Sequence, residues 1–518
     1  MKEPTLKQAS LADDPLPAGT SSSYSQIVKS SSMIGGAHGI NYLIGMVRTK
    51  LVAVLLGPAG VGLVGLYQST ISMVGAFTAM GINSSGVREI AEANGKADPV
   101  EVARTILTLR RACWVTGVFG CFLTIALSYP LSLWIFSAGE RALPIALLGI
   151  TLLLGSISGG QKALLQGVRR IGDLAQLSVL SAIVGTVVAV GFYTWLGERG
   201  IVPVLITIAA FNLATSWWFA RKVEVVTVTQ SFTETWQKSQ QLVSLGLAFM
   251  WSGLLAAAVP LVIRSLIIRQ LGIDAGGVYH AAWAISGMFA GFILGAMSAD
   301  FYPRLTAVAD DNAAVNRLVN EQTEIGILLA LPGILGVLTF ATWMMQLFYS
   351  AKFIPGADLL PYFALGVFGR VICWPMGFIQ LAKGASRWFV ATQSIFHVMH
   401  LALSILFLHW LDLRGVALAF VAMYGLHLVG LRWVAGCLSN FCWTHSVLRL
   451  LIVSTSLVAG GFFFQHWLPG MIGLTIGGIL TAVSCIFSLR GIACRLGGQH
   501  RLVRLACRLP GGRCFCGI

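Results

Sequence analysis

Long apolar runs, separated by short polar segments, recur along most of the chain. From about residue 30 to residue 490 the runs reach roughly 20 residues each, which is the length that an α-helix needs to cross the ~30 Å hydrocarbon core of a bilayer. The pattern predicts fourteen such helices. We therefore expect an all-α polytopic membrane protein.

The polar breaks divide the chain into six parts. We expect a disordered cytoplasmic tail, an N-terminal lobe of six spans, a cytoplasmic linker, a C-terminal lobe of six spans, a C-terminal helix pair and a basic cytoplasmic tail. In the same order, the expected ranges are 1–29, 30–220, 221–241, 242–436, 437–490 and 491–518.

The two halves of the chain resemble each other at an offset of about 215 residues. Leu56-Gly57 matches Leu271-Gly272, and residues 195–201 match residues 410–416 at the same offset. Gln166-Gly167 also aligns with Lys383-Gly384 to within two residues of that spacing. Because each repeat holds an even number of spans, both halves enter the membrane from the same side. We expect two pseudo-symmetric lobes that face each other across a central cavity.

Composition and charge agree with a membrane protein. Hydrophobic residues make up 56% of the chain and charged residues 11%, whereas soluble domains carry about a quarter charged residues. The net charge of +15 does not indicate nucleic-acid binding, because most Lys and Arg residues fall on one side of the membrane if the N-terminus is cytoplasmic. The ten cysteines are scattered and show no spacing typical of a metal site.

Several cations lie inside the spans, whereas every acidic residue falls in a loop, a tail or a span end. A cation at mid-helix costs about 2.5–3.5 kcal/mol on insertion scales, so each one must face protein or water. Arg370 lies midway along its span and shares a helix face with Gly366, Cys373 and Gly377. These small neighbours predict a ligand cavity, and a structural Arg bonded to carbonyl groups of a neighbouring helix is the alternative.

A polar stripe in the first span contains Arg48. His38, Asn41 and Gly45 precede Arg48 on one helix face, so we expect the stripe to line the cavity. Lys50 lies two residues further on, about 200° around the helix. We expect Lys50 to contact a neighbouring helix or the membrane interface.

Two further arginines lie in the first span of the second lobe. Arg264 takes almost the same place there as Arg48 takes in the first lobe, which predicts a facing pair. Arg269 lies nearer the outer end and is expected to extend to the interface. A cavity lined by cations without a central carboxylate favours an anionic ligand, because a guanidinium binds phosphate oxygens through a planar fork of donors.

Four short segments, spread over both halves, are similar to a known family. They read LVAVLLGPAGVGLVG at 51–65, RLT at 304–306, YSAKF at 349–353 and LAKGASR at 381–387. The chain from about residue 30 to residue 436 resembles the bacterial flippases for O-antigen and enterobacterial common antigen repeat units. These flippases are the oligosaccharide branch of the multidrug, oligosaccharidyl-lipid and polysaccharide exporter superfamily.

The resemblance implies a V-shaped cavity between two six-helix lobes. It also implies transport of an undecaprenyl-diphosphate-linked oligosaccharide from the cytoplasmic to the periplasmic leaflet of the inner membrane by alternating access, with no catalysis, no cofactor and no nucleic-acid partner. Membrane lipids and other polysaccharide-assembly proteins are the further partners expected. Arg48, Arg264 and Arg370 are expected to bind the diphosphate, and the secondary candidates for the cavity are His38, Asn41, Lys50, Arg269 and Gln380.

Three alternatives stay open. A cation-coupled multidrug exporter of the same fold is expected to keep an Asp or Glu inside the membrane, and none lies at the centre of a span. A peptidoglycan lipid-precursor flippase shares the fold. A membrane scaffold, or a polymerase of the same lipid-linked glycan, is the third alternative, although a polymerase is expected to carry a periplasmic loop longer than the segment 129–143.

Overall fold

The computed structural model describes residues 19–95, 98–468 and 470–496, and every regular element in these ranges is helical. The predicted all-α fold is therefore confirmed. In chain order the elements are α1 (Gly19–Ala79), α2 (Ile82–Gly95), α3 (Pro99–Phe136), α4 (Ala142–Gly167), α5 (Ile171–Leu196), η1 (Gly197–Gly200), α6 (Ile201–Ala220), α7 (Phe232–Leu271), α8 (Ile273–Ala307), α9 (Asn312–Phe348), η2 (Ala351–Asp358), α10 (Leu360–Ala382), α11 (Ser386–Ser439), α12 (His445–Trp467) and α13 (Gly470–Leu496).

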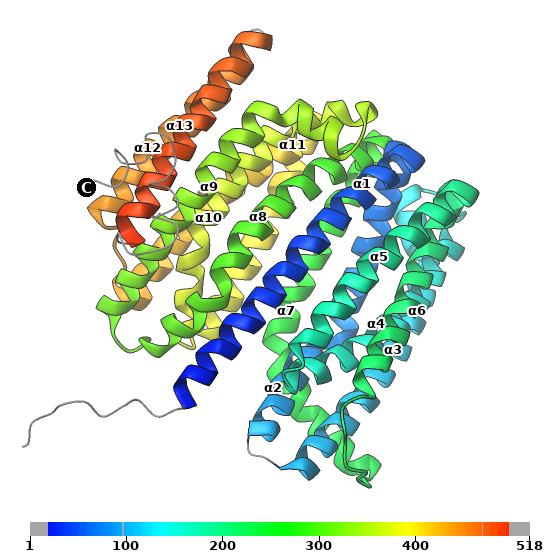
Figure 1. Cartoon of the computed structure of the whole chain (residues 1–518). Coiled ribbons are helices and arrows are strands. Elements are labelled where there is room, and N and C mark those ends of the chain that lie inside the picture. The colour runs from blue at the N-terminus through cyan, green and yellow to red at the C-terminus, as the bar shows by residue number, and fades with distance from the viewer. Residues whose placement is uncertain (1–18, 96–97, 469, 497–518) are drawn as a thin grey trace, which may run out of the picture.

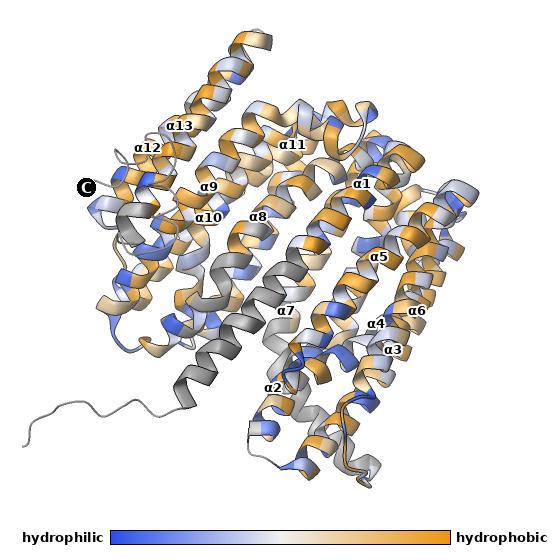
Figure 2. Ribbon diagram, in the orientation of Figure 1, coloured by the Kyte–Doolittle hydropathy of each residue, from blue (hydrophilic) through white to orange (hydrophobic). Residues whose placement is uncertain are grey.

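Ten segments of the described chain are long and apolar enough to cross a membrane. Three of these segments contain a break and so comprise two passes each: α1 at Gly57, the α5–α6 segment at η1, and α11 at Asp412. α8 is not one of the ten segments, but its 35 residues are long enough to cross a bilayer. Counted with the others, it brings the membrane-length helical stretches of the described chain to fourteen, the number that the hydrophobic pattern predicts. Figure 2 shows apolar residues along the helices and hydrophilic residues gathered at the loops.

Two helices begin earlier than expected. α1 begins at Gly19, so residues 19–29, which the sequence predicts as disordered tail, are helical. α7 begins at Phe232, within the expected linker 221–241. Once an apolar span has formed the costly first turn of a helix, further turns add at little cost, so the helix extends into polar sequence. Residues 1–18 and 497–518 of the two expected tails lie outside the described ranges.

The backbone reproduces the sequence repeat at its breaks. Gly57 has φ 66° and ψ −170°, and Gly272, which lies 215 residues later, has φ 90° and ψ 169°. Gly197 has φ 56° and ψ −133°, and its counterpart Asp412 has φ 51° and ψ −139°. Positive φ is the region that glycine enters without steric cost, so Asp412 adopts an unfavourable conformation to make the same turn.

A third turn corrects the predicted register. Arg169 and Gly384 both have positive φ, at 59° and 65°, and they too are separated by 215 residues. The helices that follow begin in the same register, at Ile171 and Ser386. The match of Gln166-Gly167 with Lys383-Gly384 is therefore displaced by two residues from the structural alignment.

The helices form two lobes and an additional pair (Figure 1). Following the sequence repeat, we refer to α1 to α6 as the N-lobe and to α7 to α11 as the C-lobe, whose core centres on α9 and α10. α12 and α13 pack against α9 at the edge of the C-lobe, where the hydroxyl oxygens of Thr339 and Thr481 lie 3.4 Å apart. The C-terminal pair is thus docked on one lobe.

The lobes meet at the end of the molecule where Gly57 and Gly272 lie. A Cβ on Gly62 would lie 2.7 Å from the Ile273 carbonyl oxygen, and a Cβ on Gly277 would overlap the Pro58 carbonyl oxygen. Pro58 and Ile273 are 215 residues apart, as are Gly62 and Gly277, so the contact is reciprocal about the pseudo-twofold axis. We call these four residues the interlobe contact. Buried apolar side chains from both lobes pack nearby: Leu66, Ile135, Leu261 and Ile268.

Candidate functional site

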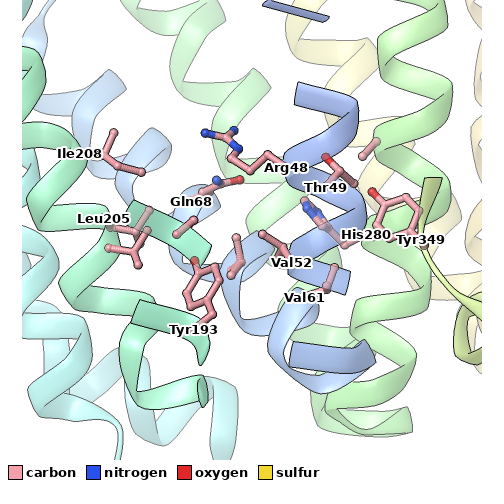
Figure 3. A pocket seen from close by; sticks show the side chains of 14 residues that line it. Arg48, Thr49, Val52, Val61, Gln68, Tyr193, Leu205, Ile208, His280 and Tyr349 are labelled. Atoms are coloured by element: carbon pink, nitrogen blue, oxygen red, sulfur yellow. The ribbon is translucent and has the colours of Figure 1, made fainter. Parts of the chain in front are cut away.

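A cavity of about 280 Å³ lies between the lobes and is lined by residues of both (Figure 3). We call it the interlobe cavity. Its polar side chains are Arg48, Thr49, Gln68, Tyr193, His280 and Tyr349. The N-lobe supplies the first four, while His280 comes from α8 and Tyr349 from the turn before η2. The rest of the lining is apolar: Val52, Val61, Val64, Ala189, Val204, Leu205, Ile208 and Ala284.

Arg48 is the cation of this cavity. Its half-buried side chain lies on α1 nine residues before the Gly57 break, and the guanidinium projects away from α1 toward Gln68 and Ile208 (Figure 3). Within the described residues the guanidinium has no hydrogen bond and no ion pair, and no carboxylate lines the cavity. Gly185 of α5 lies opposite the guanidinium. Because glycine has no side chain, space remains beside the Nη1 atom of Arg48. The donors of Arg48 are therefore free to bind an anion.

Arg264 lies outside this cavity, contrary to the predicted facing pair. The side chain is buried, and its Nη1 donates to the Gly65 carbonyl oxygen at 2.9 Å and to the Ser69 hydroxyl. The interlobe contact brings α7 against the second half of α1, so the guanidinium finds acceptors on the opposite lobe. In this conformation Arg264 joins the two lobes and does not face Arg48 in the cavity.

A second cavity, of about 360 Å³, lies within the C-lobe between α7, α10 and α11. Arg370 lines this C-lobe cavity together with the aromatic rings of Trp374 and Tyr424. The Arg370 side chain is exposed, and it has neither a hydrogen bond nor an ion pair with any residue in the described part of the chain. Among the described residues, no carbonyl group of a neighbouring helix accepts a hydrogen bond from this guanidinium, which is the arrangement that the alternative predicts.

The small residues around Arg370 play different parts. A Cβ on Gly377 would meet no atom within 4 Å, so the space beside Arg370 lies on that side. A Cβ on Gly366 would overlap the ring of Phe420, so Gly366 is a packing position and opens no space. Cys373 is buried and lies with its sulfur 4.0 Å from the Tyr424 carbonyl oxygen. Only part of the predicted small-residue face therefore borders the cavity.

Two secondary candidates of the first span contact other helices. Asn41 donates to the Ser178 hydroxyl of α5 at 2.6 Å, and Lys50 donates to the Gln346 carbonyl oxygen near the end of α9. Neither side chain lines either cavity. The side chain of His38 lies outside the described residues. The polar stripe therefore places only Arg48 in a cavity among its described polar members.

The remaining secondary candidates also lie outside both cavities. Gln380 is buried and accepts a hydrogen bond from the Thr392 hydroxyl at 2.9 Å, which joins α10 to α11. Arg269 is exposed near the end of α7. The Gln380 bond joins two neighbouring helices of the same lobe, so in this conformation the side chain contributes to helix packing and does not face a cavity.

Sequence reasoning missed several polar lining residues. Gln68 and His280 face the interlobe cavity, whereas Gln393, His397 and His427 line the C-lobe cavity. Each is a Gln or His within an apolar span, and a polar residue in such a place could have indicated a cavity. Polar residues inside membrane helices also serve in helix packing, so the sequence alone does not separate the two roles. In the described ranges no three His, Cys, Asp or Glu side chains are grouped to hold a metal ion.

Two repeat-related helical lobes around an interlobe cavity are a fold that solved structures of transporters share. The structure is similar to the lipid II flippase MurJ in an inward closed conformation, with a TM-score of 0.68 and 12% identity over 89% of this chain and 99% of that chain. It is also similar to an inward-facing multidrug resistance MATE family transporter, with a TM-score of 0.66 and 17% identity over 77% of this chain and 96% of that one.

The sequence comparisons identify the family. The family model described as polysaccharide biosynthesis protein matches residues 27–308, and the chain belongs to this family. A curated relative is the lipid III flippase of Escherichia coli K12, which is 21% identical over 393 residues, covering 73% of this chain and 91% of the relative. The lipid III flippase of Shigella flexneri matches with the same values. The resemblance to bacterial oligosaccharide flippases, which the four sequence segments indicate, is confirmed.

Proposed function

We propose that the chain is a flippase that moves a lipid-linked oligosaccharide between the leaflets of the bacterial inner membrane by alternating access. The observation that carries this proposal is the free guanidinium of Arg48 in a cavity between the lobes. Family membership and the likeness to lipid III flippases support the same substrate class. The substrate is then a glycan joined to undecaprenol through a diphosphate.

The diphosphate binds at Arg48 in this proposal. A guanidinium offers two parallel N–H donors to a phosphate group, which gives both charge and orientation. Gln68 and Tyr193 line the same cavity and supply neutral donors nearby. The protein forms and breaks no covalent bond in this process, so we propose a transporter without catalytic residues.

The glycan contacts the C-lobe cavity. Trp374 and Tyr424 provide aromatic faces, and Gln393 and Arg370 provide donors for sugar oxygens. This combination of apolar walls and a few polar groups is typical of small-molecule sites. We therefore assign Arg48 to the diphosphate and Arg370 to the sugars, in place of a single site for both arginines.

The orientation follows from charge and aromatic residues. With the basic loops in the cytoplasm, the interlobe contact lies at the periplasmic end. Trp195 and Trp410 are repeat counterparts at that end, and 84% and 68% of their surfaces are exposed, as expected of an interfacial aromatic belt. At the opposite end the Arg221 guanidinium lies 4.9 Å from the Trp218 ring centre. The structure then represents a state closed toward the periplasm.

A multidrug exporter is disfavoured by the cavity linings. Neither cavity is lined by Asp or Glu, the residues that would attract a cationic drug or bind a coupling cation. Two unpaired arginines line the cavities instead, one in each, and they repel cations by Coulomb's law. The cavities therefore favour an anionic substrate.

Transport in proteoliposomes tests the proposal. The purified protein is reconstituted with an undecaprenyl-diphosphate oligosaccharide that carries a fluorescent sugar, and a membrane-impermeant glycosidase reports which molecules reach the outer leaflet. We expect protein-dependent exposure of the sugar, lost in Arg48→Gln and retained in Arg199→Gln, which changes an exposed cation of η1. Transport of a cationic dye without movement of the glycolipid would overturn the proposal.

A further inference from the structure

Two cations cross between the lobes and bond to main-chain carbonyl oxygens on the other side. Arg264 of α7 donates to the Gly65 carbonyl oxygen of α1, which is 199 residues away in sequence. Lys50 of α1 donates to the Gln346 carbonyl oxygen of α9, which is 296 residues away. Each lobe therefore sends one cation from its first helix to the opposite lobe, and neither cation lines the interlobe cavity or the C-lobe cavity.

The two cations lie close to the interlobe contact in sequence and in space. Lys50 is seven residues before Gly57, and Arg264 is eight residues before Gly272. A Cβ on Gly65, whose carbonyl oxygen accepts the Arg264 bond, would lie 2.5 Å from the His280 ring nitrogen, so the His280 side chain of α8 packs closely against α1 here. The bonds therefore span the region where the lobes already touch.

The Arg264 bonds form at a cost that keeps them reversible. The side chain is 9% exposed, and its Nε has no hydrogen-bond partner within the described residues. Burial of a cation with an unsatisfied donor opposes closure, whereas the bonds to Gly65 and Ser69 favour it. Opposing contributions of this kind suit a contact that must form and break in each transport cycle.

We propose that Arg264 and Lys50 are positioning residues that latch the lobes together at the interlobe contact. The latch favours the conformation seen here, in which this end is closed, and it opens when the lobes separate and water reaches both cations. Both cations donate to main-chain carbonyl oxygens, which are present whatever the side chain at the accepting residue. The latch therefore depends on the two cations and on how close each one lies to the main chain of the opposite lobe. The latch acts on the conformational equilibrium of the two lobes, whatever the identity of the substrate.

Distance measurements between the lobes test this proposal. Spin labels are attached at positions 195 and 410 through a genetically introduced keto amino acid, because the chain has ten cysteines. These positions are exposed repeat counterparts in different lobes at the closed end. In nanodiscs without substrate we expect one dominant short distance. Arg264→Gln should increase the population of a longer distance about fivefold, since a hydrogen bond to a charged group is lost.

Matched variants make the measurement decisive. Lys50→Gln and Ser69→Ala should shift the same population to a smaller extent, and the Arg264→Gln and Lys50→Gln double variant should shift it furthest. Arg199→Gln, an exposed cation at the same end, should leave the distribution unchanged. If Arg264→Gln does not fold, the Lys50 and Ser69 variants still test the latch. Unchanged distances in every folded variant would overturn the latch, whether or not the protein transports lipid.

Discussion

Gly62 and Gly277 stand 215 positions apart in the sequence and pack against each other where the two lobes meet. A Cβ on Gly62 would lie 2.8 Å from the Gly277 backbone nitrogen. The sequence repeat therefore brings its own equivalent positions into contact at the pseudo-twofold axis. A contact between equivalent residues must accommodate the same side chain twice, and glycine leaves room for both backbones.

Enlarging this contact should destabilise the closed state. In Gly277→Ala the new methyl group would overlap the Pro58 carbonyl oxygen, which is backbone and can only move with its helix. We expect a loss of about 1–3 kcal/mol, typical of overpacking. Thermal unfolding in detergent measures the effect as a lower Tm. Gly430→Ala on α11, where no atom lies within 4 Å, is the matched control. Equal Tm values for the two variants would show that the lobes are not in this contact.

The sequence predicts the fold well because its signals are local and repeated. Spans follow from runs of apolar residues, and the repeated Leu-Gly pairs mark turns whose backbone angles agree between the lobes. The early start of α1 at Gly19 was missed because hydropathy marks the membrane boundary and not the end of the helix. The aligned turns at Arg169 and Gly384 were missed because one of the two residues is not glycine.

Arg48 variants should show whether transport needs the planar guanidinium group or only a positive charge at this position. Arg48→Lys keeps the positive charge but loses the planar fork, so we expect translocation to fall at least tenfold, close to the loss in Arg48→Gln. Initial rates in the proteoliposome assay give this comparison. Arg199→Lys should transport at the wild-type rate, because that side chain is exposed on η1. Full activity of Arg48→Lys would instead indicate that simple electrostatic attraction is sufficient.

The candidate site was only partly predictable. In the sequence Arg48, Arg264 and Arg370 look alike, as cations inside apolar spans. In the structure Arg48 lines the interlobe cavity, Arg370 lines the C-lobe cavity and Arg264 lines neither. The partner of Arg264 is a main-chain carbonyl oxygen 199 residues away, and such an acceptor leaves no signal in residue identity. Helical periodicity gives the face on which a residue lies, but it does not give the element that covers that face.

Arg370 variants should act on the glycan and not on the diphosphate. We expect Arg370→Ala to slow translocation of the full oligosaccharide at least tenfold while a substrate with a single sugar moves nearly as fast as with the wild-type protein. Arg48→Gln should slow both substrates, because both carry the diphosphate. In cells Arg370→Ala should abolish surface glycan at an unchanged protein level in the membrane. Equal losses for the two substrates would place Arg370 with the diphosphate instead.

Asp412 offers a test of the repeat through stability. Its φ of 51° and ψ of −139° match those of Gly197, and within the described residues its exposed side chain makes no hydrogen bond or ion pair. Asp412→Gly relieves strain of about 1–3 kcal/mol and loses about 0.5–1 kcal/mol through the greater freedom of glycine in the unfolded chain. We therefore expect a higher Tm in detergent.

The reciprocal substitution makes this test symmetric. Gly197→Asp places the same side chain in the same backbone conformation in the N-lobe, so it should lower the Tm by a similar amount. Asp412→Asn keeps the side-chain size and tolerates positive φ slightly better, so it should change the Tm little. A lower Tm for Asp412→Gly than for the wild-type protein would mean that Asp412 stabilises the turn. The turn would then be maintained differently in the two lobes, despite their shared backbone angles.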